Sequence, residues 1–189
     1  VTGVQTCALP ISFSIARRLL RAAEELPKPN GERLREFSDA GRESFELSLF
    51  SEEPIHEDLE SLLLSDSLTF LAEKLGHGDP TVQAVLAGKS PRARASELVR
   101  GTKVREVALR RRLYKDGASA VAAARDPMIE LARTVDAEAR DLRRRLEALD
   151  ETKRQAYAAI SKARFALDGP KSYPDATFTL RLSYGVVKG

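Results

Sequence analysis

The sequence predicts a mainly α-helical fold, in which a multi-helix domain ends in one long helix that leads into a single β-strand. Three observations predict it. A helix-capping residue followed by proline occurs at Asp79-Pro80, Ser90-Pro91 and Asp126-Pro127, and this pair is typical of helix starts. Apolar residues recur every three or four positions through most of residues 14–167, which indicates helices. Strict apolar and polar alternation is confined to residues 177–184.

The first part of the chain is predicted to form three helical stretches. Residues 14–26 carry one apolar face, and the proline-rich segment 27–30 ends it. A second stretch covers residues 34–49, with an interruption at Gly41. A third is opened by Pro54 and closed by Gly76.

Shorter helices with explicit start and stop residues are predicted next. They cover residues 80–88, 91–101 and 102–114, and Gly117 stops the last of them. Asp126-Pro127 then begins a further short helix. The close spacing of these signals favours short helices packed into one lobe.

The long helix is predicted from Asp136, as its N-cap, to Gly169-Pro170, which stops it. At 1.5 Å per residue it would be about 45 Å long. Its apolar or small residues follow a heptad-like seam, in which Lys153 fills the missing position: Ala139, Leu142, Leu146, Leu149, Ala156, Ile160, Ala163 and Leu167. Such a seam predicts packing along partner helices. Its alanines and Lys153 favour packing within one domain over a dimeric coiled coil.

The predicted strand cannot satisfy its own backbone hydrogen bonds. Residues 177–184 place Phe178, Leu180, Leu182 and Tyr184 on one face, and a lone strand needs neighbours. We therefore expect the chain to be a piece of a larger protein. Residues 1–11 (VTGVQTCALPI) resemble the translated remnant of a sequencing adapter, so they are left out of the predicted fold together with Cys7.

Composition fits one helical domain of ordinary size. The 189 residues are 42% hydrophobic and 31% charged, with a net charge of +3. The charge is uneven, because residues 24–60 contain 12 acidic and 4 basic residues, whereas residues 89–112 contain 9 basic and 2 acidic ones. With a single cysteine, no disulfide or cysteine–zinc framework is expected. No apolar run reaches the roughly 18 residues of a membrane span.

No local motif predicts a catalytic, cofactor-binding or metal-binding residue. His56 and His77 lie at opposite ends of one predicted helix, too far apart to share a metal ion, and are expected at the surface. Gly88-Lys89-Ser90 lacks the first glycine of a phosphate-binding loop and is interpreted as a helix end followed by a cap. The basic residues 89–112 have no interleaved aromatics, so charge complementarity with the acidic segment is favoured over nucleic-acid binding.

Five segments, in this order, resemble the helical insert and re-entry strand of the bacterial dipeptidyl-peptidase 7 and 11 family, serine peptidase family 46. The resemblance covers nearly all of residues 14–189, and its last segment is the most specific. The segments are KPNGERLREFSD (28–39), LFSEEPIHEDLE (49–60), AGKSPRARASELVRGTKV (87–104), DPMIELARTVD (126–136) and YPDATFTLRLSYGVVKG (173–189).

The resemblance implies a chymotrypsin-like double β-barrel interrupted by an α-helical domain that caps the active-site cleft. It implies a serine exopeptidase that releases dipeptides from peptide N-termini, needs no cofactor, and works in the periplasm or at the cell surface of a Gram-negative bacterium. It is compatible with a homodimeric parent protein. The family's catalytic histidine and aspartate precede the insert, and its serine follows it in a Gly-Asn-Ser-Gly-Ser-type turn. No such motif occurs here, so no catalytic residue is assigned.

The expected domains are an adapter-derived segment (1–11), the helical cap domain (12–170) and the start of the returning barrel (171–189). The expected partners are peptide substrates, with no nucleic acid and no membrane span. A stand-alone helical interaction or nucleic-acid-binding module is the alternative. The sequence does not determine the preferred dipeptides or the oligomeric state.

Overall fold

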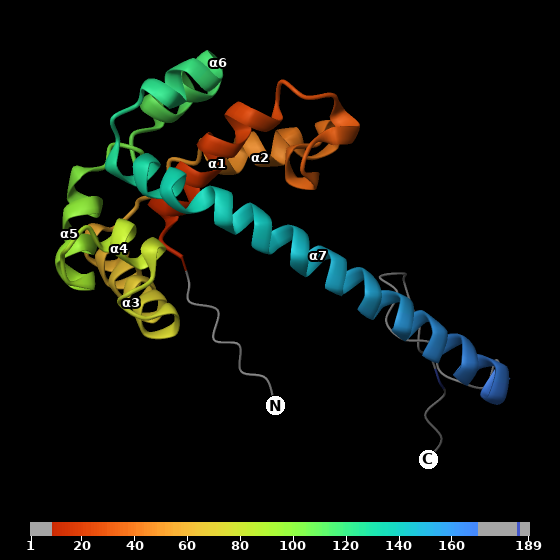
Figure 1. Cartoon of the computed structure of the whole chain (residues 1–189). Helices are drawn as coiled ribbons and strands as arrows, with labels where there is room; N and C mark the ends of the chain where they lie inside the picture. Colours follow the sequence, from red (N-terminus) through yellow and green to blue (C-terminus); the bar gives the residue numbers. More distant parts are fainter. Residues whose placement is uncertain (1–8, 170–184, 186–189) are drawn as a thin grey trace. The chain divides into compact units, whose positions relative to one another are not determined.

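The computed structural model describes residues 9–169 and residue 185 of the chain (Figure 1). The mainly α-helical fold predicted from the sequence is confirmed. The predicted strand 177–184 lies outside the described residues. The helices of the described part are α1 (Ile11–Glu25), α2 (Arg42–Leu49), α3 (Glu57–Leu75), α4 (Pro80–Leu86), α5 (Pro91–Gly101), α6 (Val107–Ala123) and α7 (Pro127–Asp168). Three short 3₁₀ turns, Asn30–Glu32, Arg35–Phe37 and Asp39–Gly41, separate α1 from α2.

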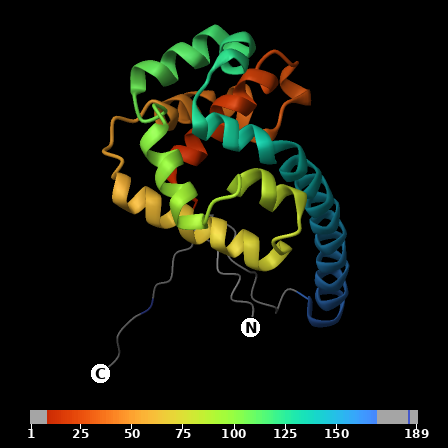
Figure 2. The same ribbon diagram turned by 60° about the vertical axis from the view of Figure 1, so that its left-hand side comes forward.

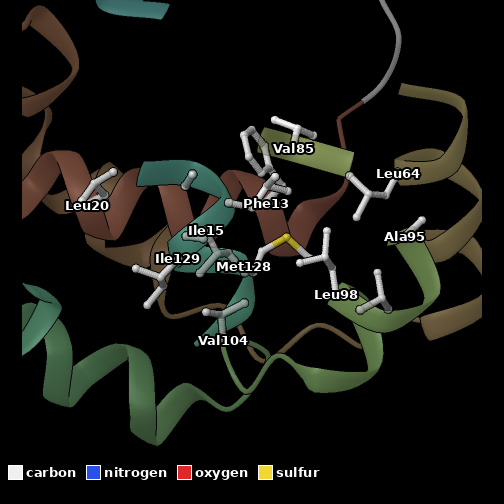
Figure 3. Close-up of a cluster of buried hydrophobic side chains, with 14 of the residues drawn as sticks. Phe13, Ile15, Leu20, Leu64, Val85, Ala95, Leu98, Val104, Met128 and Ile129 are labelled. Atoms are coloured by element: carbon white, nitrogen blue, oxygen red, sulfur yellow. The ribbon is translucent and has the colours of Figure 1, made fainter. Parts of the chain in front are cut away.

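The chain divides into two compact units, residues 1–140 and 141–189, and α7 belongs to both. The hydrophobic core lies in the first unit. Figure 3 shows side chains from α1, α5 and the start of α7 gathered in this core. Met128 and Ile129 of α7 are fully buried there, as is Leu98 of α5. Burial of these side chains is the main stabilising contribution to this unit.

Within the first unit, the helices pack in pairs that come from distant parts of the sequence. α3 packs against α5, and α1 packs against α6 (Figure 2). Arg21 of α1 forms an ion pair with Asp136 of α7, with 2.7 Å between its Nε atom and the carboxylate. α1 therefore packs against α6 and is joined to α7 by this ion pair.

The predicted cap-and-proline starts are confirmed where they can be checked. The Asp79 carboxylate accepts hydrogen bonds from the Thr81 and Val82 N–H groups, and the Ser90 hydroxyl accepts one from the Ala93 N–H. α4 and α5 therefore begin at Pro80 and Pro91. Each of these starts is encoded within four residues, which explains why the sequence alone predicts it.

The Asp126-Pro127 start is also confirmed, but the helix that it begins is not short. Asp126 accepts bonds from the Met128 and Ile129 N–H groups and from Thr102 Oγ1 and the Lys103 N–H, so it caps α7 and also fixes the segment after α5. α7 runs without a break for 42 residues, or about 63 Å.

The prediction that Asp136 begins the long helix is therefore wrong. Asp136 lies more than two turns inside α7 and is buried, with ion pairs to Arg21 and to Arg140. An aspartate ahead of an apolar run indicates an N-cap from local sequence. Here it is instead the partner of two arginines, one of which is 115 residues away.

Three other predicted boundaries shift. The stretch 34–49 is helical in the α form only from Arg42 to Leu49, because 3₁₀ turns occupy the part before Gly41. α3 begins at Glu57, three residues after Pro54. α6 begins at Val107 and continues past Gly117, whose φ of 72° and ψ of −150° put a kink between two helical segments. A glycine at positive φ costs little, so the chain bends there and resumes its helix.

In the second unit, the described residues are those of α7 from Asp141, together with Gly169 and Gly185. Their apolar seam is exposed, and the expected packing along partner helices is not present among the described residues. The exposed fractions are 50% for Leu142, 60% for Leu146, 65% for Leu149, 55% for Ile160 and 87% for Leu167. Ion pairs within the helix join its exposed charged residues, for example Arg145 with Asp141 at 2.7 Å and Arg154 with Glu151 at 2.6 Å.

Candidate functional site

The candidate site is a groove in the first unit between α1, α2, the segment that follows α2, and α6. Its volume is about 480 Å³, within the range of roughly 300–1,000 Å³ that is common for small-ligand sites. Its lining combines polar and apolar side chains. Its lining residues are Ile11, Ser14, Ile15, Arg18, Ser44, Leu47, Ser48, Ser51, Glu53, Pro54, Ile55 and Arg110.

Arg110 fixes the inner wall of the groove. It is 2% exposed and donates from Nη1 to the Leu49 and Ser51 carbonyl oxygens, at 2.8 and 3.0 Å, and from Nη2 to the Arg105 carbonyl oxygen at 2.8 Å. The bonds from Nη1 satisfy carbonyl groups at and just beyond the end of α2. Its Nε atom is buried without a hydrogen-bond partner in the described part of the chain. Burial lowers the pKa of Arg110, and no carboxylate pairs with it there.

Glu60 holds the other end of the groove in place. It is 1% exposed, and its carboxylate accepts hydrogen bonds from the Ile11 and Ser12 N–H groups, both at 2.8 Å. A carboxylate at a helix N-terminus satisfies unpaired N–H groups and interacts favourably with the helix dipole. Glu60 of α3 thus caps α1 across 48 residues of sequence and positions Ile11 at the groove edge.

Arg18 and Glu53 are the accessible charged residues of the groove. Arg18 donates from Nη1 to the Ser48 hydroxyl at 2.7 Å, and its guanidinium lies 5.8 Å from the centre of the Phe45 ring. Glu53 is exposed, and its backbone N–H donates to the Ser51 hydroxyl. Neither side chain forms an ion pair within the described residues. The groove therefore presents a cation, held by Ser48 and Phe45, and an exposed anion, neither of which has an ion-pair partner among the described residues.

The two histidines do not form a site. His56 and His77 are both exposed, and neither side chain has a hydrogen-bond partner in the described part of the chain. Among the same residues, no group of three or more histidine, cysteine, aspartate or glutamate side chains is arranged to hold a metal ion. No described helix is long and apolar enough to cross a membrane.

The basic stretch 89–112 is largely used inside the first unit. Lys89 and Arg94 both pair with Glu97, at 2.7 and 3.0 Å, and Arg105 pairs with Glu57 at 2.6 Å. Arg111 stacks on the Phe50 ring at 4.7 Å. Of these ion pairs, Arg105–Glu57 joins the basic stretch to the acidic stretch 24–60, whereas the pairs of Lys89 and Arg94 lie within the basic stretch.

Sequence reasoning did not single out Arg18, Glu53 or Arg110 as site residues. Arg18 flanks the apolar face of α1, and Glu53 belongs to an acidic run, so each has the pattern of an ordinary surface residue. Arg110 stands in a row of three arginines, which gives no sign that one of them is buried. Only the tertiary structure brings these residues into one groove.

Fold and groove together define a helical domain with a ligand-sized groove of mixed polar and apolar lining, and with no histidine–nucleophile pair among its described residues. Over residues 5–189 the sequence matches the family model described as peptidase S46. The chain belongs to this peptidase family, which confirms the resemblance found in the five sequence segments. A search of curated proteins found no match.

Proposed function

We propose that these residues are the helical domain of a serine-type exopeptidase that releases dipeptides from free peptide N-termini. In this proposal the domain covers the active-site cleft of a double β-barrel, and the serine, histidine and aspartate of the catalytic triad belong to other parts of the protein. The protein works in the periplasm or at the cell surface. The family match over residues 5–189 is the observation that carries the proposal.

The exposed seam of α7 supports a covering role. Leu131 and Val135 lie on the same helical face as Leu142, Leu146 and Leu149, because these positions follow the three- and four-residue steps of one face. Leu131 is 4% exposed in the core, whereas Leu149 is 65% exposed. The helical face that packs in the core at Leu131 is still lined by leucines where it is exposed. We expect these exposed leucines to pack against another protein surface. In the proposal, that surface belongs to the rest of the peptidase.

The test uses the complete reading frame from which this chain comes. We expect the purified protein to release dipeptides one after another from a peptide with a free N-terminus. It should leave the same peptide intact when its N-terminus is acetylated. A serine-directed covalent inhibitor should abolish release, and a metal chelator should not change it. Light scattering on the same preparation gives the oligomeric state, for which we expect a monomer or a homodimer.

Two results would contradict the proposal. One is cleavage inside the acetylated peptide at a rate similar to that of the free peptide, which would indicate an endopeptidase. The other is dipeptide release by this 189-residue chain alone, which would place the catalytic residues inside it. The chain alone is the matched control, because it contains the helical domain without any residue to which we assign catalysis.

A further inference from the structure

A second hollow of the first unit is lined by the end of α5, by both segments of α6 and by the chain that leads into α7. Its volume is about 460 Å³, within the range of roughly 300–1,000 Å³ that is common for small-ligand sites. Leu109 and Leu113 line it from the α6 segment before the kink at Gly117, and Ala120 and Ala123 line it from the segment after the kink. The bend of α6 therefore brings two short helical faces to one hollow.

Part of this lining is apolar and continuous with the hydrophobic core. Leu113 is 3% exposed and belongs to the core. Leu109, Ala120 and Ala124 are half-buried and pack against it. Covering such a surface with an apolar group removes it from water, which is favourable. Because alanine side chains are small, a larger residue at position 120, 123 or 124 would occupy part of the hollow.

The lining also carries three unpaired positive charges. Lys103, Arg112 and Arg125 are exposed, and none of their charged groups has a hydrogen-bond or ion-pair partner among the described residues. This distinguishes them from Arg105, which is paired with Glu57. An anion that enters the hollow therefore meets cations that do not have to give up an existing contact.

The carboxylate in the lining, Asp126, is already used inside the protein. It is 7% exposed and accepts four hydrogen bonds. Its Oδ1 atom accepts from Thr102 Oγ1 and from two N–H groups in the first turn of α7, and its Oδ2 atom accepts from the Lys103 N–H. Three positive charges thus face one negative charge that is committed to a helix cap, so the hollow favours an anion over a cation.

We infer that this hollow binds a small amphipathic carboxylate, whose apolar chain or ring packs against the leucines and alanines and whose carboxylate is bound by the unpaired cations. Arginine suits a carboxylate, because its guanidinium can donate two parallel hydrogen bonds to the two oxygens. A purely apolar ligand would leave the cations without a partner, and a bare anion would leave the apolar surface uncovered. The inference goes beyond the proposed function, because it involves no residue of a catalytic triad and no peptide substrate.

The binding test uses the 189-residue chain and 4-phenylbutyrate as probe, measured by nuclear magnetic resonance titration of backbone amides. We expect saturable shifts at Leu113, Ala120 and Ala123. The neutral 4-phenylbutyramide should bind about tenfold more weakly or worse, because it lacks the charge that the cations attract. Acetate should also bind at least about tenfold more weakly, because it has almost no apolar surface to bury.

A pair of double variants tests the role of the cations. Arg112→Gln combined with Arg125→Gln should weaken binding of 4-phenylbutyrate about tenfold or more and abolish its preference over the amide. Arg100→Gln combined with Lys115→Gln is the control, because it removes the same two positive charges at exposed positions outside this lining. The control should change neither quantity.

A pair of single variants tests the role of the apolar surface. Ala123→Leu should weaken binding of 4-phenylbutyrate about tenfold, because the larger side chain takes up space in the hollow. Ala122→Leu adds the same side chain at an exposed neighbouring position outside the lining and should have no effect. Thermal unfolding of all the variants verifies that they fold.

Any of four outcomes would overturn the inference. They are no saturable shifts with 4-phenylbutyrate, equal binding of 4-phenylbutyrate and its amide, equal effects of the two double variants, or tighter binding of hexaglutamate than of 4-phenylbutyrate. The last result would show a site for an acidic peptide instead of a small amphipathic anion. Binding is measured without turnover, so none of these outcomes bears on the dipeptide-release assay of the complete protein.

Discussion

At the scale of residues, four buried or half-buried charged side chains join α1 to α7. Arg140 pairs with Asp136 at 2.6 Å and with Glu25 at 2.9 Å, and Arg21 pairs with the same Asp136 at 2.7 Å. Glu25 is 1% exposed and also accepts from Lys28 Nζ and the Leu34 N–H. Removing one member of such a network leaves its partners buried and unpaired, so a single substitution in the network should be strongly destabilising.

The pKa of Glu25 makes this network sensitive to acid. Burial alone would raise that pKa, but hydrogen bonds from Lys28, the Leu34 N–H and Arg140 outweigh burial and lower it to about 2, from an ordinary 4.5. Burial likewise opposes the lowered pKa of Asp136, which hydrogen bonds from Arg140 and Arg21 produce. A lowered pKa in the folded state stabilises the protein above the unfolded value, and this stabilisation is lost as the pH falls towards the folded value.

We therefore expect the free energy of unfolding to fall between about pH 5 and pH 2, with a contribution from Glu25 on the order of 3 kcal/mol. Glu25→Gln should be less stable at pH 7, and its stability should fall less steeply over the same pH range. Urea unfolding at several pH values measures both quantities. Glu32→Gln, at an exposed position, is the control. Parallel curves for Glu25→Gln and the unchanged chain would contradict this account.

At the scale of elements, the success of sequence reasoning depended on the range of the interactions involved. Starts at Pro80, Pro91 and Pro127 were predictable because the capping side chain lies next to the helix that it caps. Asp136 was misread because its partner Arg21 is 115 residues away. The cap of α1 was not predicted either, since it is supplied by Glu60 of α3. Local sequence patterns predict where helices begin. They do not predict an ion pair or a helix cap whose two partners are far apart in the sequence.

The two parts of α7 should respond oppositely to substitution. In the 189-residue chain, Leu131→Ala should lower the free energy of unfolding by about 2–5 kcal/mol, because Leu131 is 4% exposed and its loss leaves a cavity. Leu149→Glu should change it by less than about 0.5 kcal/mol, because Leu149 is 65% exposed. Urea denaturation of both variants makes the comparison.

The same Leu149→Glu change becomes informative in the complete protein. If the seam of α7 is covered there, as proposed, burying a carboxylate against it should destabilise the complete protein by several kcal/mol more than it does this chain. Ala148→Glu, at an exposed position of the same helix, adds the same single negative charge and is the control. Equal, small effects of Leu149→Glu in both proteins would show that the seam has no partner.

At the scale of the whole molecule, the groove depends on four segments that are far apart in the sequence. α1, α2, the segment after α2, and α6 each contribute lining residues, and Arg110 and Glu60 hold these segments together by bonds across 61 and 48 residues. Helical periodicity predicted most of these helices but not which polar faces would meet. The mainly helical class was thus predictable from the sequence, while the candidate site needed the tertiary structure.

The two units should differ in local stability. Amides of α1 between residues 15 and 22 lie in the core, where exchange with solvent requires opening of the whole unit. α7 between residues 145 and 165 has exposed side chains throughout and is stabilised by its own backbone bonds and by ion pairs worth about 0.3–0.5 kcal/mol each. In proteins most helical stability comes from tertiary packing of an apolar face, which these described residues lack. Hydrogen exchange read by mass spectrometry should therefore be at least about tenfold faster at residues 145–165 than at residues 15–22. Equally slow exchange at both sites would contradict this expectation if it persists on dilution, because residues 145–165 would then be covered within the chain itself. If the slow exchange at residues 145–165 disappears on dilution, a second copy of the chain covers them.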